Sequence, residues 1–299
     1  MFNNLLVPLD GSKLSEAALG PAAFLTQKLN ASVMLLHVIE QDAPAEVHKE
    51  HHLTESHEAD AYLREAAHRA FPPGIQVQTH VHTAPVTDVA RSITEHAASE
   101  FNPGLIVICT HGRGGMRDLF FGSIAQQVVA QCQTPLLVIK PDAPPFNLDR
   151  ILVPLDPDSV HDESVQIAES LAKDFDSELL LLNVIPTLST VSGEQVATSS
   201  FMPSSTKEYL NLRQEEASEH LEGHVEEFHA RGIKASAEVA RGDPASVIVR
   251  TAERSGAGML FLSTHRRVGM DAFWALSVAP EVAQKTKVPL LLIPLSRSK

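Results

Sequence analysis

The stretch 109–123, CTHGRGGMRDLFFGS, carries glycines and a serine at a spacing that could hold a phosphate group. Glycine allows positive φ angles and lets a ligand approach the backbone where a Cβ would collide. Gly112 and Gly122 frame the stretch, and Ser123 is a good N-cap for the helix expected after it. The N–H groups of a helix's first turn bind anions, and Arg113 could add positive charge. The pattern by itself also fits a glycine-rich turn before an ordinary capped helix.

A carboxylate stands at the end of the first apolar run, in the segment VPLDGS. Asp10 could accept hydrogen bonds from a ribose or from an adenine amino group. It could equally form an Asx turn before a helix, and Asp156 fits that turn in the second half of the chain. Both interpretations of Asp10 stay open at this point.

Four histidines, His48, His51, His52 and His57, gather in the segment HKEHHLTESH. Imidazoles this close in sequence could bind zinc. The segment is polar, however, and it lacks a nearby cysteine and a tight His-Glu zinc-protease signature. A solvated loop is the favoured interpretation, and we do not expect a functional zinc site in it.

Residues for hydrolytic or redox catalysis are hard to find in the sequence. We see no serine nucleophile elbow, no P-loop and no second carboxylate to work beside Asp10 on a water molecule. Cys109 lies between Ile108 and Thr110 at the end of an apolar run, which favours a buried thiol over a redox sensor. We therefore do not expect a fast hydrolase, while slow turnover of a bound nucleotide stays open.

The elements that must position these residues alternate along the chain, with apolar runs typical of strands between amphipathic stretches typical of helices. In the first half we expect strands at Leu5–Leu9, Val33–Val38, Gln76–Val81, Leu105–Cys109 and Leu136–Ile139, and helices at Ser15–Leu29, Ala59–Phe71, Val86–Ala98 and Gly122–Gln133. In the second half we expect strands at Ile151–Leu155, Glu178–Val184, Lys234–Val239, Met259–Ser263 and Leu290–Ile293, and a long helix at Thr206–Arg231. Each half is thus predicted to be a doubly wound, Rossmann-like α/β domain with a five-stranded, mostly parallel sheet.

The chain is an internal duplication. NNLLVPLDGSKLSEAAL at 3–19 matches DRILVPLDPDSVHDESV at 149–165, and the proline-rich stretch 141–149 reads as a linker. We expect one domain over residues 1–142 and a second over residues 148–299. Their last strands are expected at sheet edges, where they can pair with each other and make the tandem chain an internal pseudo-dimer. A homodimer between two chains stays open.

Composition limits the partners. The 299 residues carry a formal net charge of −13, which argues against nucleic acid or an anionic membrane as a partner over a broad surface. No apolar run approaches the roughly 20 residues that span a bilayer, and the start of the chain lacks a charged leader with a cleavage site. Two cysteines are too few for a disulfide framework. These features predict a cytoplasmic protein.

Three segments of the first half together resemble a universal stress protein domain: NNLLVPLDGSKLSEAAL, VMLLHVIE and LIVICTHGRGGMRDLFFGSIAQQVVAQCQTPLLVIKP. The second half resembles the same family more distantly, so the likeness covers nearly the whole chain as a tandem pair. It implies the adenine-nucleotide-hydrolase-like fold, in agreement with the fold expected from the periodicity.

The resemblance implies an ATP site in the first half. Family members that bind ATP carry the motif G-x2-G-x9-G-[S/T], whose second glycine, third glycine and hydroxyl residue fall on Gly112, Gly122 and Ser123. The first glycine falls on Cys109, a departure, because a thiol there can crowd or weaken the site. Ile124 follows Ser123 in the phosphate loop. The adenine pocket would be formed by Pro8, Leu9, Asp10, Val38 and Ile108.

The second half departs further from the motif, with Ser263, Arg266 and Leu276 at the three glycine positions. Leu276 places side-chain carbons where phosphate oxygens would lie, and Arg266 loses the backbone freedom of glycine. We therefore expect that the second half does not bind ATP as the family's binders do.

These observations favour a cytoplasmic stress-response protein whose first half binds ATP, with or without Mg²⁺, as a regulatory ligand. The alternative is a protective or protein-interaction module that works without nucleotide, and Cys109 and the altered second half favour it. An adenine nucleotide and an unidentified protein are the expected partners. Metal storage by the histidine segment is a third hypothesis, which has the weakest support.

Overall fold

The structure is a computed structural model that describes residues 2–47, 50–110, 123–155, 162–187, 203–265 and 278–295. The chain divides into two compact units with a boundary between Phe146 and Asn147. The first unit also includes the last strand of the chain, and the second unit contains most of the remaining residues after the boundary.

The first unit is built on a parallel sheet. Its strands are β1 (Asn4–Pro8), β2 (Ser32–Glu40), β5 (Val77–Val86), β6 (Leu105–Cys109) and β7 (Leu136–Ile139). They are ordered β7-β6-β1-β2-β5, and each pairs in parallel with its neighbours. Strand β12 (Leu290–Leu295) adds to β7 in the antiparallel direction. The pairing expected between the last strands of the two repeats is therefore confirmed, with Leu291 opposite Leu137.

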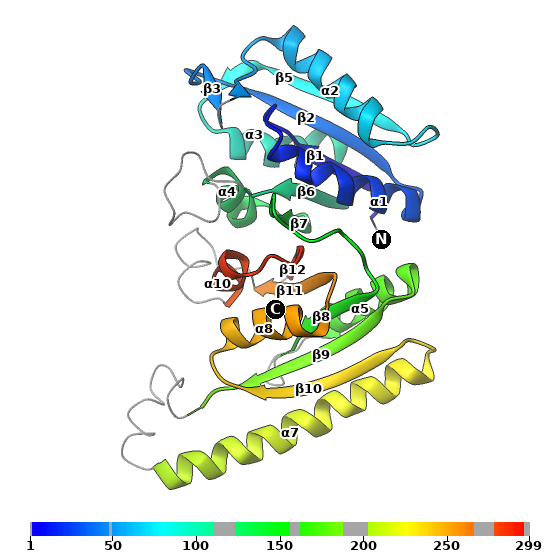
Figure 1. Ribbon diagram of the computed structural model, residues 1–299, viewed down its shortest axis with the longest axis vertical. Helices are drawn as coiled ribbons and strands as arrows, with labels where there is room; N and C mark the ends of the chain where they lie inside the picture. The colour runs from blue at the N-terminus through cyan, green and yellow to red at the C-terminus, as the bar shows by residue number, and fades with distance from the viewer. Residues whose placement is uncertain are drawn as a thin grey trace. The chain divides into compact units, whose positions relative to one another are not determined.

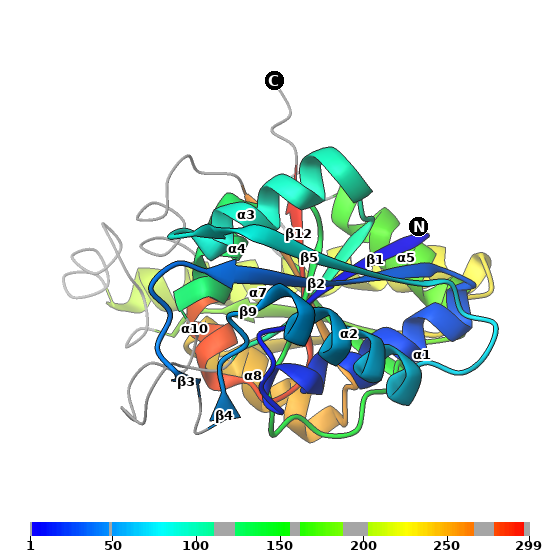
Figure 2. The same cartoon turned by 90° about the horizontal axis from the view of Figure 1, so that it is seen from above.

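Helices cover both faces of this sheet. The 3₁₀ turn Ser15–Ala18, α1 (Leu19–Leu29) and α2 (Ser56–Ala70) lie on one face, and α3 (Val89–His96) and α4 (Ser123–Gln131) lie on the other, as Figure 2 shows. A π-helical turn at Ala97–Phe101 continues α3, and the short strands β3 (Glu46–Val47) and β4 (Glu50–His51) form a small antiparallel pair. The central strands are buried on both faces, which explains their nearly continuous aliphatic sequences.

The boundary between β5 and α3 differs from the prediction. We expected a helix from Val86, but β5 continues to that residue, which pairs with Glu40 beyond an irregularity in the register. The helix starts at Val89 because the Asp88 carboxylate accepts a hydrogen bond from the Arg91 N–H at 2.9 Å and caps the first turn. The spacing of apolar residues, on which the prediction was based, does not reveal this capping interaction.

The second unit repeats the parallel arrangement. Its strands β8 (Arg150–Pro154), β9 (Glu178–Ile185), β10 (Ala235–Arg241) and β11 (Met259–His265) are ordered β10-β9-β8-β11. Its helices are α5 (Asp162–Phe175), α7 (Pro203–Ala230), α8 (Pro244–Ser255) and α10 (Val278–Lys285). Figure 1 shows the long α7 running beside β10.

The expected long helix is confirmed, and so is most of its buried stripe. Leu210, Ala217, Leu221 and Phe228 are buried along α7, while Val225 is half-buried. Among the described residues, no helix combines the length and apolarity needed to cross a membrane.

Candidate functional site

The carboxyl ends of β2, β1 and β6 lie side by side in the first unit. The parallel pairing places Pro8 of β1 opposite Leu36 of β2, and β1 also pairs with β6. Asp10 follows β1, Cys109 ends β6 and Val38 lies near the end of β2, so all three are at the same edge of the sheet. The strand order reverses between β1 and β6, and such reversal points are where doubly wound sheets bind ligands.

Asp10 forms a turn with Ser12. Its carboxylate oxygen Oδ1 accepts hydrogen bonds from the Ser12 N–H at 2.9 Å and from the Ser12 hydroxyl at 2.7 Å. The Ser15 hydroxyl then donates to the Ser12 carbonyl at 2.8 Å. The Asx-turn interpretation is thus confirmed. The turn holds the half-buried Asp10 at the strand end. The role of Asp10 toward a ligand stays a prediction.

Gly11 has to be glycine in this turn. Its φ angle is +90°, and a Cβ placed on it would lie 2.8 Å from Cδ1 of Leu53. A side chain at this position would meet both backbone strain and a collision. The segment after Asp10 is therefore tightly packed against the chain around Leu53.

A polar side chain on the neighbouring strand contacts the backbone carbonyl of the leucine after the first strand in both repeats. The buried His37 on β2 has its ring nitrogen Nδ1 2.8 Å from the Leu9 carbonyl oxygen. At the matching position of β9, the buried Asn183 donates its amide N–H to the Leu155 carbonyl at 2.7 Å. Sequence analysis missed this pair, although a polar residue inside an aliphatic strand is a visible signal.

Four of the five residues expected in the adenine pocket are apolar, the exception being Asp10. Leu9, Val38 and Ile108 are buried, and Pro8 is half-buried. They come from the three neighbouring strands β1, β2 and β6. The structure therefore brings together the residues that the resemblance groups, and their binding of adenine stays a prediction.

Cys109 is buried and carries no charge at neutral pH. Burial, together with the smaller effect of the nearby negative charge of Asp10, raises the pKa of its thiol to about 12. The expectation of a buried thiol is confirmed. A protonated thiol adds bulk to the edge of the sheet without adding negative charge that would repel a phosphate.

Most of the glycine loop lies outside the described residues. This applies to Gly112, Arg113 and Gly122, for which the prediction is unchanged. The described chain leaves β6 at Thr110, whose N–H donates to the Ile139 carbonyl at 2.8 Å, and resumes at Ser123, the first residue of α4. Because β6 and β7 are parallel, the helix between them starts at the carboxyl edge. The half-buried Ile124 lies in its first turn.

Fewer of the corresponding residues of the second repeat lie within the described part of the chain. Ser263 lies on β11, whereas Asp156, Arg266 and Leu276 lie outside the described residues. Its predicted failure to bind ATP stays a prediction.

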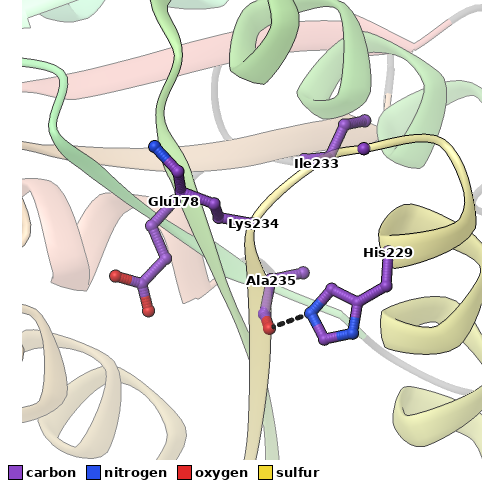
Figure 3. A pocket seen from close by; sticks show the side chains of 6 residues that line it. Glu178, His229, Ile233, Lys234 and Ala235 are labelled. Atoms are coloured by element: carbon purple, nitrogen blue, oxygen red, sulfur yellow. Dashed lines mark hydrogen bonds between the residues drawn. The ribbon is translucent and has the colours of Figure 1, made fainter.

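In the second unit, a pocket of about 550 Å³ lies at the amino ends of the strands, by the start of β9 and β10 (Figure 3). Its polar groups already have protein partners. The His229 ring nitrogen Nε2 lies 3.0 Å from the Ala235 carbonyl oxygen. Glu178 pairs with Arg150 at 2.7 Å, and Lys234 pairs with Asp176 at 3.0 Å. The Arg150 hydrogen bond also lowers the pKa of Glu178. We assign no ligand to this pocket.

The histidines of the segment HKEHHLTESH that the structure describes do not share a common partner. His51 Nε2 is 3.3 Å from a Glu58 carboxylate oxygen, and the buried His52 has Nδ1 3.2 Å from the Pro44 carbonyl oxygen. His57 is exposed, and His48 lies outside the described residues. A different group of three histidines in the first unit, His80, His82 and His96, does come together.

The fold and the strand order define a doubly wound α/β protein built from two repeats. The sequence model of the universal stress protein family matches residues 1–140 and again residues 147–294. The chain therefore belongs to the universal stress protein family, and it carries two copies of the domain.

Curated relatives match one copy at a time. The chain is 28% identical over 152 residues to universal stress protein YxiE of Bacillus subtilis, covering 47% of this chain and 100% of that protein. It is 31% identical over 140 residues to universal stress protein Sll1654 of Synechocystis, covering 46% of this chain and 86% of that protein.

Some solved structures match nearly the whole length of the chain. A universal stress protein from Archaeoglobus fulgidus aligns with a TM-score of 0.66 and 18% identity, covering 98% of this chain and 96% of that one. A protein described as a putative universal stress protein from Pseudomonas aeruginosa aligns with a TM-score of 0.69 and 18% identity, covering 98% and 93%. At this identity the likeness establishes the fold alone.

Proposed function

We propose that the first repeat of this stress protein binds ATP, with or without Mg²⁺, at the carboxyl edge formed by β2, β1 and β6, in the cytoplasm. The observation that carries the proposal is the convergence of Asp10, Val38 and Cys109 at the point where the strand order reverses, next to the helix that begins at Ser123. The resemblance of 109–123 to the motif of ATP-binding family members supports ATP as the ligand.

The donors and acceptors at this edge suit an adenine nucleotide. The first turn of α4 offers backbone N–H groups to a phosphate, and Asp10 offers a carboxylate to a ribose or an amino group. The buried aliphatic side chains of Val38 and Ile108 suit a planar base. The neutral thiol of Cys109 leaves the edge free of an added negative charge.

The nucleotide is proposed to act as a regulatory ligand with little or no hydrolysis. Bound ATP at 100 times its Kd would stabilise the site by about 2.7 kcal/mol, enough to bias the conformation of a surface that a protein partner recognises.

The experiment compares two glycine variants of the full chain. Gly122→Leu puts the residue of the second repeat, Leu276, into the first. We expect it to lose both the ATP-induced thermal shift and any adenine nucleotide that co-purifies with the protein. The matched control is Gly20→Leu, because Gly20 is exposed on α1 and a Cβ there meets nothing within 4 Å.

The control variant should keep the thermal shift. Equal ATP responses of wild type and Gly122→Leu would overturn the proposed site. Absence of any response in the wild type would favour the alternative, a protective or interaction module that works without nucleotide, to which the thiol at the first glycine position of the motif already points.

A further inference from the structure

Three histidines of the first unit meet between β5 and α3. His80 and His82 are two residues apart on β5, so their side chains leave the strand on the same face. His96 lies in the last turn of α3, on the face of the sheet that this helix covers (Figure 2). One ligand-type nitrogen from each of the three rings lies within 4.8 Å of the other two.

The rings already contact one another. His80 Nε2 lies 3.1 Å from His96 Nε2, and the ring centroids of both His80 and His82 lie 4.9 Å from that of His96. Two imidazole nitrogens at hydrogen-bond distance need one proton between them, because a lone pair on one must face an N–H on the other. A metal ion takes the place of such a proton when both nitrogens turn their lone pairs toward it.

His96 is oriented as a metal ligand is. Its Nδ1 lies 2.8 Å from the Ser92 carbonyl oxygen, which can only accept, so Nδ1 carries the proton and Nε2 carries the lone pair. Metal-binding histidines usually hold the second nitrogen in this way, with the N–H on a backbone carbonyl or a carboxylate. His96 is buried, so its ring is held in place, while His80 and His82 are half-buried and leave a route from solvent.

We propose that His80, His82 and His96 bind a divalent first-row transition metal ion, with zinc as the ion that the ligand set suits best. Three imidazoles occupy three positions of a tetrahedron and leave the fourth for water or another donor. Zinc–nitrogen bonds of about 2.0–2.1 Å require the nitrogens to stand about 3.4 Å apart, so the present spacing closes with small side-chain rotations. This site is separate from the proposed nucleotide site and does not depend on it.

The second repeat supplies a natural comparison. The strand registers, with Val33 opposite Val77 and Leu179 opposite Ala235, place Glu238 and Ala240 at the positions of His80 and His82. Counting from the capping aspartates of α3 and α8 places Thr251 at the position of His96.

Glu238 is engaged in an ion pair with Arg254. The second repeat therefore has the same elements without the histidines. The substitutions His82→Ala and His96→Thr copy residues that this fold already accommodates.

The test uses full-length protein without a histidine tag, stripped with chelator and titrated with Zn²⁺ against a chromophoric competitor. We expect about one tightly bound Zn²⁺ per chain in the wild type. We expect His82→Ala and His96→Thr each to lose it, with circular dichroism confirming that both variants fold. Because His96 is buried, the half-buried His82 provides the variant less prone to disturb folding.

A matched control removes another close histidine pair. His220 and His224 on α7 have ring centroids 4.7 Å apart, and His220→Ala/His224→Ala should keep the tight zinc. Co²⁺ bound to the wild type should give the strong visible absorption of a tetrahedral site, and His82→Ala should abolish it. Tight zinc that survives in both cluster variants, zinc lost only in the α7 control, or a wild type with no tight zinc would each overturn the proposal.

Discussion

The thiol of Cys109 is the residue that sets this chain apart from the ATP-binding motif it otherwise resembles. Its burial beside Asp10 keeps it protonated at neutral pH. Compared with the glycine of the motif, the cysteine side chain therefore adds volume at this position but no charge. We expect the exchange to weaken ATP binding by sterics alone.

The raised pKa of Cys109 gives a pH prediction. With a pKa of about 12, roughly one thiol in 10,000 is ionised at pH 8, so native Cys109 should react very slowly with a thiol reagent, and faster by about tenfold per pH unit up to the point of unfolding. The unfolded chain ionises this thiol near its ordinary pKa of 9.0, so folding stability should fall as pH rises from about 9 toward 12.

The measurement is stopped-flow labelling with mass spectrometry to separate Cys109 from Cys132. Rapid modification of Cys109 at pH 8 in the folded protein would contradict the burial that we describe. The variant Cys132→Ala leaves Cys109 as the single thiol and serves as the control.

Some side-chain contacts between distant parts of the chain could not be predicted from the sequence. His37 and Asn183 differ in type, yet each lies against the carbonyl of the leucine that precedes a strand-end aspartate. The interaction became visible only once the two strands were aligned. The three clustered histidines were missed for a similar reason, because His96 is far from His80 and His82 in sequence and meets them only when α3 packs on the sheet.

At the scale of elements, the two repeats start matching helices with the same device. Asp88 caps α3 by accepting from the Arg91 N–H, and Asp243 caps α8 by accepting from the Ser246 N–H, both at 2.9 Å. The hydrogen bonds from Ser246 lower the pKa of Asp243 below its ordinary value of 3.8. The ionised carboxylate is therefore the form that stabilises the helix.

We expect Asp243→Ala to lower the free energy of unfolding by about 1 kcal/mol at neutral pH, and Asp243→Asn to retain most of it. Because the folded pKa is lowered, the contribution of the cap is full above pH 3.8 and disappears as the pH falls below that value. Urea unfolding of the three proteins at pH 7 and at low pH checks both statements. A wild-type advantage over Asp243→Ala that grows on acidification would contradict them.

Elements were predicted best where the sequence repeats a strong period. The aliphatic strands and the long α7 follow from hydrophobic patterning, since buried parallel strands and a stripe at helical spacing leave clear signatures. The start of α3 was predicted too early, because valine is also common in strands. Val86 belongs to β5 because it pairs with Glu40, and α3 starts at Val89 because Asp88 caps it.

The candidate site was predictable in part. Asp10, Val38 and Cys109 could be placed at one sheet edge from the order of strands, and the structure agrees. The hydrogen bonds of Asp10 to Ser12 and the close packing of Gly11 on Leu53 depend on side-chain geometry that no sequence pattern specifies.

At the scale of the whole molecule, duplication has let two copies of one fold diverge. Both copies keep the parallel strands and the capped helices that the core needs. The glycines at 112 and 122 and the histidines at 80, 82 and 96 occur in the first copy alone. The motif glycines and the clustered histidines are therefore confined to one copy, whereas Asp10, Val38 and Ser123 of the proposed nucleotide site have the counterparts Asp156, Val184 and Ser277 in the other.

The most direct test of the account is a crystal structure of the full chain grown with ATP and Mg²⁺. We predict one nucleotide per chain, with its base at the ends of β1, β2 and β6 near Asp10 and Val38 and its phosphates at the first turn of α4. A nucleotide bound in the second repeat, or a first repeat that stays empty at saturating ATP, would contradict it.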